Sequence, residues 1–132
     1  MVLGDTDAFF SAVYEPLEHT ATTTPLAVDR VVMAACTNRA YRDFGDPGTA
    51  LIWSGLEMNG QALADPDAAS VTAAINRLYQ RGLGRRAKES EIDHHIELYA
   101  DIVAAGTSNE PARDWATLSC FATLTSMEML FY

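Results

Sequence analysis

A short pattern of residues occurs twice in this chain of 132 residues, and it limits the possible folds more than any other feature of the sequence. Each copy has a tyrosine near the end of one helix-like stretch, a glycine in the turn, and a second helix-like stretch that stops at another glycine. The copies cover about residues 38–60 and 76–106. Because a repeated helix–turn–helix unit must bury its apolar face against a neighbour, the pattern predicts two packed helical repeats. Their defining residues are Tyr41, Gly45, Trp53, Gly60, Tyr79, Gly84 and Gly106.

Prolines and glycines divide the chain into expected helices. Four of the five prolines follow or lie near a good capping residue, and proline suits the first position of a helix because the N–H that it lacks would have no partner there. Between these starts, apolar residues recur at the spacing of one helix face. No stretch alternates β-branched or aromatic residues with polar ones, so we expect no strand. The expected helices span residues 6–19, 25–44, 47–59, 66–82, 90–105 and 109–131.

These helices predict an all-α fold, a single compact bundle of about six helices built around the two repeats and spanning residues 1–132. A chain of this length can form one domain with its own hydrophobic core. In such a bundle we expect Trp53 to pack in the core. We expect Tyr41 and Tyr79 to be buried at equivalent junctions between helices.

The charge of the chain constrains its partners. A net charge of −9 and an isoelectric point near 4.5 argue against nucleic acid, because phosphates attract basic surfaces. No stretch of about 18 apolar residues is present, so we expect no membrane span. Five of the nine basic residues lie between Arg77 and Lys88. Such a cluster is usually a solvated face, but it could also bind an acidic protein, an anionic glycan or a lipid head group. The candidate anion-binding residues are Arg77, Arg81, Arg85 and Arg86.

Two half-patterns in the copies carry a family resemblance. The second copy has Tyr79, Leu83, Gly84 and Arg85, and the first has Gly45, Pro47, Trp53, Leu56 and Gly60. Over about residues 38–106 they resemble a family of domains of unknown function that occur as short helical repeats in large secreted bacterial proteins, including S-layer, RTX-type and adhesin-like proteins. The resemblance implies a surface or assembly role at the cell exterior, by packing, oligomerisation or binding of a glycan or ion. It implies no catalytic residue.

The chain departs from that family's pattern at several positions. Asp46 stands where the turn arginine is expected, and Glu91 stands where a glycine is usual. His94 and His95 replace the aromatic pair of the second helix.

Glu91, His94 and Glu97 are three residues apart on an expected helix, so neighbouring pairs could chelate a divalent cation together. A di-metal bundle would need a second Glu-x-x-His pair, which the chain lacks. His95 lies about 100° around the helix from His94, and we expect it to be semi-buried and hydrogen-bonded. These residues define a candidate metal site.

Four aspartates flank the turns of the two repeats, and calcium prefers loop carboxylates and carbonyls. No calcium-binding loop motif is present, and helix capping explains three of the four without an ion. Calcium therefore stays open as a ligand, and no other cofactor is expected. The aspartates are Asp43, Asp46, Asp65 and Asp67.

The two cysteines, Cys36 and Cys120, allow one disulfide or none. Both lie in apolar helical stretches, so burial as two unpaired thiols is the favoured interpretation. The N-terminal residues have no positively charged segment before an apolar run, so we expect no classical signal peptide. The acid and apolar residues of 128–132 are similar to the ends of proteins exported without one, but the favoured interpretation is the last turn of an amphipathic helix packed on the core. We expect a secreted or cell-surface location by such a route, or otherwise the cytoplasm.

Together these observations favour a non-enzymatic helical interaction or assembly module of a secreted or cell-surface bacterial protein, acting by self-association or by binding another protein. The chain has no Gly-x-Ser-x-Gly motif, and its glycine-rich stretch at 82–84 follows no strand, so no catalytic mechanism is indicated. The alternative is a small metal- or ligand-binding helical bundle, with or without enzymatic activity, that uses Glu91, His94 and Glu97.

Overall fold

The structure of the protein is a computed structural model that describes residues 24–126, with side chains described from residue 27 onward. In this range the chain forms four α-helices, one short 3₁₀ helix and one two-stranded sheet. The mostly helical fold confirms the all-α class, apart from the small sheet. The helix expected over 6–19 and the end of the helix expected over 109–131 lie outside the described residues. The elements are α2 (Thr24–Gly45), η2 (Pro47–Thr49), β1 (Met58–Asn59), β2 (Ala62–Leu63), α3 (Ala69–Leu83), α4 (Glu89–Ala105) and α5 (Pro111–Leu124).

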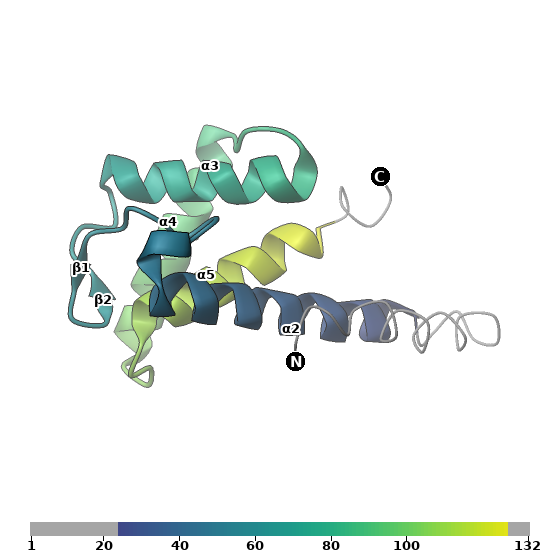
Figure 1. The fold of residues 1–132 in the computed structure, drawn as a ribbon, viewed down its shortest axis with the longest axis horizontal. Helices are drawn as coiled ribbons and strands as arrows, with labels where there is room; N and C mark the ends of the chain where they lie inside the picture. The colour runs from purple at the N-terminus through teal and green to yellow at the C-terminus, as the bar shows by residue number, and fades with distance from the viewer. Residues whose placement is uncertain (1–23, 127–132) are drawn as a thin grey trace.

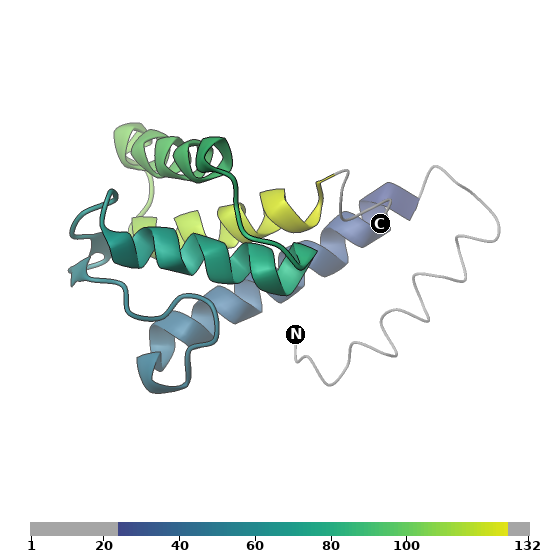
Figure 2. The same ribbon diagram turned by 90° about the horizontal axis from the view of Figure 1, so that it is seen from above.

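Helix α5 lies at the centre of the fold and packs against α2, α3, α4 and strand β2. In Figure 1, α2 runs along the bottom and α3 along the top, with α5 between them. Figure 2 shows the same arrangement from above, and in both views α2 extends beyond the other helices at its N-terminal end. The bundle therefore uses mainly the C-terminal half of α2.

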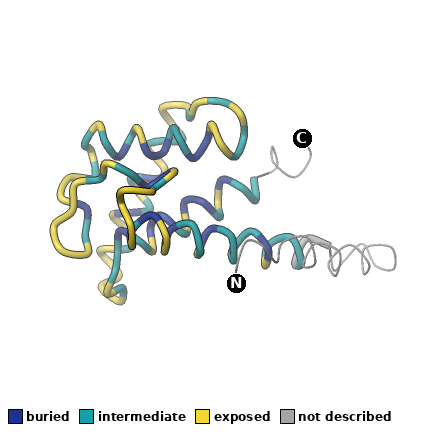
Figure 3. The backbone as a smooth tube through the Cα atoms, viewed as in Figure 1, coloured by how far each residue is buried: buried dark blue, intermediate teal, exposed yellow. Residues whose placement is uncertain are grey.

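Trp115 of α5 is the centre of the hydrophobic core. It is fully buried, and the rings of Trp53 and Tyr99 meet it edge-on at centroid distances of 5.2 and 6.0 Å. Its indole Nε1 donates to the backbone oxygen of His95 at 2.8 Å. Trp53 is 3% exposed, which confirms its expected place in the core. Figure 3 shows that the buried positions of α3 lie on the side that faces α5.

A disulfide joins Cys36 of α2 to Cys120 of α5, with the two Cα atoms 5.6 Å apart. The expectation of two unpaired thiols is therefore wrong. The bridge spans 84 residues of sequence, and a loop of that length corresponds to about 4–5 kcal/mol of stabilisation in the chain-entropy description. The pairing depends on where α2 crosses α5, which helical periodicity does not determine.

The helix expected over 47–59 does not form. Residues Pro47–Thr49 make a single 3₁₀ turn, and the chain then runs irregularly to the β1–β2 hairpin. Gly60 has a φ of 66° and is the first residue of a two-residue hairpin loop, where a type II′ turn requires a positive φ. The expectation of no strand is therefore also wrong. The antiparallel pairs are Met58 with Leu63 and Asn59 with Ala62.

Helices α3 and α4 form the helix–turn–helix that the second copy predicts. Gly84 ends α3 at a φ of 71° and Gly106 ends α4 at a φ of 68°, the left-handed conformation expected of C-terminal glycines. Helix α4 begins at Glu89, just before the expected start at Ser90. The carboxylate that caps it belongs to Glu91, whose Oε1 accepts the backbone N–H of Lys88 at 2.7 Å.

The two copies are not structurally equivalent, because the first copy has no second helix. Tyr79 is 5% exposed, whereas Tyr41 is 66% exposed. The expectation that both tyrosines are buried at equivalent junctions is therefore wrong. On α2, Cys36, Ala40 and Asp43 face the bundle, and Tyr41 lies about 100° around the helix from Ala40, outside that face.

Candidate functional site

Asp43, near the C-terminal end of α2, is a buried carboxylate that organises the loop after that helix. Its Oδ1 accepts the N–H of Leu51 at 3.1 Å, and its Oδ2 accepts those of Ile52 and Trp53 at 3.0 Å each. Nη2 of Arg39, one turn earlier on α2, lies 3.0 Å from Oδ1. A buried charge is costly unless it is paired and hydrogen-bonded, and these four partners meet that condition.

Arg77 of α3 holds the same loop from its other side. Its Nε donates to the backbone oxygen of Ile52 at 2.8 Å, and its Nη2 donates to that of Ser54 at 2.6 Å. The N–H groups of the loop therefore bind a carboxylate, and its carbonyl groups bind a guanidinium. This arrangement leaves the side chain of Leu51 at the surface.

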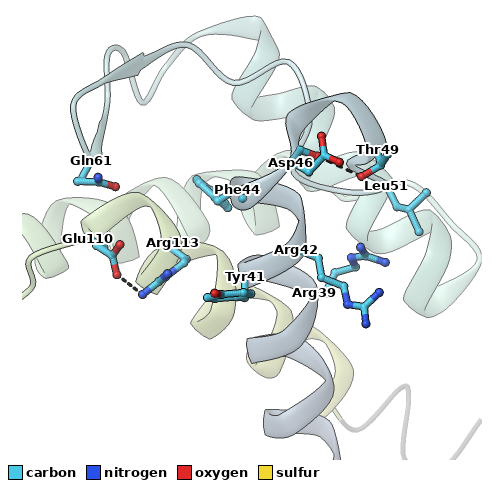
Figure 4. Close-up of a pocket in the computed structure, with 11 residues that line it drawn as sticks. Arg39, Tyr41, Arg42, Phe44, Asp46, Thr49, Leu51, Gln61, Glu110 and Arg113 are labelled. Atoms are coloured by element: carbon cyan, nitrogen blue, oxygen red, sulfur yellow. Dashed lines mark hydrogen bonds and ion pairs between the residues drawn. The ribbon is translucent and has the colours of Figure 1, made fainter. Parts of the chain in front are cut away.

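A hollow of about 840 Å³ lies between the end of α2, this loop and the start of α5, and we call it the α2–α5 hollow (Figure 4). The backbone N–H of Ala112 donates to the backbone oxygen of Gln61 at 3.1 Å, which fixes the hairpin beside α5 at one edge of the hollow. The lining residues are Arg39, Tyr41, Arg42, Phe44, Gly45, Asp46, Thr49, Leu51, Gln61, Glu110 and Arg113.

Tyr41 presents an exposed aromatic ring in this hollow. The guanidinium carbon of Arg113 lies 5.7 Å from the ring centroid, and Arg113 also forms an ion pair with Glu110 (Figure 4). Arg42 is exposed, and its Nε lies 3.4 Å from Oδ1 of Asn38. Among the described residues no carboxylate pairs with Arg42. Exposed tyrosine and arginine are the residue types enriched where proteins contact one another.

A second hollow, of about 410 Å³, lies where α3, α4 and α5 meet around His95. His95 is hydrogen-bonded, as expected, and is buried rather than semi-buried; its Nε2 lies 2.9 Å from Oη of Tyr79 and 3.5 Å from Oγ1 of Thr123. Burial lowers the pKa of His95 below its usual value, so the imidazole is neutral at pH 7. The histidine therefore links three helices through uncharged hydrogen bonds.

Two of the candidate metal residues, Glu91 and His94, line this hollow, but Glu91 already has a cationic partner. Its carboxylate accepts two hydrogen bonds from the guanidinium of Arg85, at 2.8 and 2.9 Å, and these lower the pKa of Glu91 to about 2. His94 and Glu97 are exposed on α4. Within the described residues, no group of three or more His, Cys, Asp or Glu side chains is placed to hold a metal ion.

The loop aspartates have separate structural positions. Asp43 is committed to the loop and Arg39, and Asp46 precedes η2 without a side-chain capping bond. Oδ1 of Asp65 accepts the N–H of Asp67 at 3.0 Å, and α3 begins only at Ala69, after this turn, rather than at the expected residue 66. Calcium binding stays a prediction.

The four arginines of the candidate anion patch separate into two groups. Arg77, Arg81 and Arg86 line a third hollow, of about 410 Å³, on the outer side of α3. Arg85 instead binds Glu91, and its guanidinium carbon lies 5.4 Å from the ring centroid of Tyr79. The structure therefore brings three of the four together.

Sequence reasoning did not find Asp43 as the organiser of a loop, nor Arg113 and Gln61 as parts of a hollow. The available signal was the spacing of Arg39 and Asp43, which is that of a helical ion pair. That spacing does not reveal burial. Arg113 and Gln61 meet the end of α2 only through tertiary packing.

Comparison of the chain with protein-family models, with curated proteins and with solved structures finds no match. The resemblance to secreted helical-repeat domains therefore stays a prediction. Across residues 24–126, no helix is both long enough and apolar enough to cross a membrane.

Proposed function

We propose that this chain is a non-enzymatic binding module that recognises a segment of another protein in the α2–α5 hollow. The observation that carries the proposal is the exposure of Tyr41. The other two tyrosines in the described residues, Tyr79 and Tyr99, are each 5% exposed, whereas Tyr41 presents two-thirds of its surface beside a hollow of about 840 Å³. An exposed aromatic ring next to guanidinium groups is typical of residues that dominate the energy of protein–protein contacts.

The chemistry of the hollow indicates a partner segment with a carboxylate beside an apolar side chain. Tyr41, Phe44 and Leu51 offer apolar surface. Arg42 offers a guanidinium that no described carboxylate neutralises, and guanidinium groups bind carboxylates with two parallel hydrogen bonds.

The partner that we favour is a different protein rather than a second copy. The chain carries a net charge of −9, and two such copies repel each other at low ionic strength. A segment of a less acidic protein supplies the carboxylate without that repulsion between the two chains.

The disulfide supports an oxidising compartment, because such bonds persist outside the cytoplasm of most organisms and are rare within it. We therefore place the module in a secreted or cell-surface protein. Mass spectrometry of the chain isolated from its native source under thiol-blocking conditions tests this. Two blocked thiols would contradict it.

The binding test uses the disulfide-bonded chain with a library of peptides that contain Asp or Glu next to an apolar residue. Peptides are selected on the wild-type chain, and their affinities are measured by fluorescence anisotropy. We expect Tyr41→Ala combined with Arg42→Ala to weaken binding by at least about tenfold.

The matched control is Leu118→Ala, which truncates an exposed apolar side chain of α5 that does not line the hollow. It should leave the affinity unchanged. Selected peptides that bind the double variant as tightly as the wild-type chain would refute the proposed site. Light scattering in chelator and in calcium, performed in parallel, would reveal self-association if a second copy is the partner instead.

A further inference from the structure

The hollow on the outer side of α3, which we call the arginine hollow, collects positive charge on an acidic protein. Arg77 and Arg81 lie one helical turn apart on α3, and Arg86 reaches the hollow from the segment between α3 and α4. Among the residues that the structure describes, no acidic one lines the hollow, although the chain as a whole carries a net charge of −9. The other lining residues are Leu51, Ala73, Asn76 and Gln80.

The charges in this hollow lack an anionic partner in the described part of the chain. Arg81 and Arg86 are exposed, and no ion pair between residues 24 and 126 involves either of them. Arg77 binds two backbone oxygens, which carry only partial negative charge. Like charges at this spacing destabilise a helix slightly, so the ligand-free protein keeps the cluster at a cost.

The guanidinium group of Arg77 is held in place before any ligand binds, and the backbone that carries Arg86 is anchored. The backbone oxygens of Ile52 and Ser54 fix Arg77. The backbone on either side of Arg86 is anchored, because Arg85 pairs with Glu91 and the N–H of Ala87 donates to Oδ1 of Asn76 at 3.0 Å. Groups that are already ordered lose less conformational entropy on binding.

We infer that the arginine hollow binds a phosphate or sulfate group. Guanidinium donors match the oxygens of such groups in charge and geometry, and three of them on one hollow suit an anion with three free oxygens. The donors are Arg77, Arg81 and Arg86, with the amide groups of Asn76 and Gln80 beside them. The site lies outside the proposed peptide contact at Tyr41 and does not depend on it, although Leu51 borders both hollows.

The test is a titration of the disulfide-bonded chain at low ionic strength, followed by two-dimensional NMR that includes the arginine Nε–Hε signals. Inorganic phosphate and sulfate are added as free anions, and dextran sulfate is added as an anionic polymer. We expect saturable shifts in the signals of Arg77 and Arg86, and a loss of affinity of at least about tenfold in Arg81→Gln combined with Arg86→Gln.

A second double variant, which also removes two positive charges, distinguishes a specific anion site from general electrostatic attraction of anions to the protein. Arg30→Gln combined with Lys88→Gln removes two exposed positive charges that lie outside the arginine hollow. It should keep the wild-type affinity. Thermal unfolding without ligand gives a second readout, because removal of Arg81 and Arg86 relieves repulsion and should leave the melting temperature unchanged or higher.

Saturable binding of the free anions would assign the site to small phosphates or sulfates. Binding of dextran sulfate alone would assign it to an anionic polymer. An equal loss of affinity in both double variants, or no saturable binding of any of the three probes, would overturn the inference.

Discussion

In the second copy of the repeated pattern, the turn at Gly84 leads within five residues to a new helix, whereas in the first copy the end of α2 at Gly45 leads to a loop and a small hairpin. The difference follows from the position of one carboxylate. Glu91 lies after its turn, where it accepts the N–H of Lys88 and helps to begin α4. Asp43 lies before its turn and binds the N–H groups of residues 51–53.

The comparison shows that similar turn residues do not by themselves determine the structure that follows. A carboxylate downstream of the turn satisfies the open N–H groups of a new helix. A buried carboxylate upstream attracts three consecutive N–H groups to a single point, and the chain around it adopts an irregular loop. Arg77 of α3 then binds the carbonyl side of that loop.

The largest effect should come from Trp53, which lies in the core although its segment is not helical. We expect Trp53→Ala to destabilise the protein by about 3–5 kcal/mol, because it removes a buried ring that packs on Trp115. Urea unfolding followed by circular dichroism measures the change. A loss below about 1 kcal/mol would show that the loop does not carry Trp53 into the core.

Substitution of Asp43 should disrupt the loop that follows α2 in the first copy. Asp43→Asn should lower the free energy of unfolding by about 3 kcal/mol, because it removes the buried charge that pairs with Arg39 and accepts three backbone N–H groups. Asp46→Asn, an exposed neighbour without a side-chain capping bond, should change stability by less than about 0.5 kcal/mol. Equal effects of the two substitutions would contradict the role of Asp43.

In the second copy the corresponding test concerns pH. Glu91 has a pKa of about 2 in the folded chain, below its usual value of 4.5, so its contribution to stability is present above pH 4.5 and is lost as the pH falls toward 2. After allowance for solvent screening, Glu91→Gln should lower the free energy of unfolding by about 1–2 kcal/mol at pH 7. The difference from wild type should disappear at about pH 2. Glu97→Gln, on the exposed side of α4, is the control and should follow the wild-type curve.

The smallest effect distinguishes the two tyrosines of the pattern. Tyr79→Phe should destabilise the protein by about 1 kcal/mol, because it removes the hydroxyl that is hydrogen-bonded to Nε2 of His95. Tyr41→Phe should leave stability unchanged, since that ring is exposed. Differential scanning calorimetry of the pair measures both. Equal losses of stability in the two variants would contradict the different positions of Tyr41 and Tyr79 in the fold.

Much of the fold followed from local patterns. The helices expected over 25–44 and 90–105 agree closely with α2 and α4, because apolar spacing and helix-end residues act within one or two turns of chain. The segment 47–59 was misassigned, because its proline and its apolar spacing also suit a helix. The signal for the hairpin was Gly60, because a glycine suits the first position of a two-residue loop with a type II′ turn.

The candidate sites were less predictable. The position of His95 was anticipated from its angle on the helix, and three arginines of the predicted patch do share a hollow. The partners of Glu91 and Asp43 were not anticipated. A carboxylate that could bind a metal and one that binds an arginine have the same spacing on a helix, and only the surrounding structure distinguishes them.

The sequence by itself determined the mostly helical class and the ends of α3 and α4 at Gly84 and Gly106, since these depend on residue type and on spacing along the chain. The tertiary structure decided the disulfide, the loop held between Asp43 and Arg77, and the exposure of Tyr41. The physical reason is that these features depend on distances between groups far apart in the chain, and such distances are set only when α2, α3 and α5 pack together.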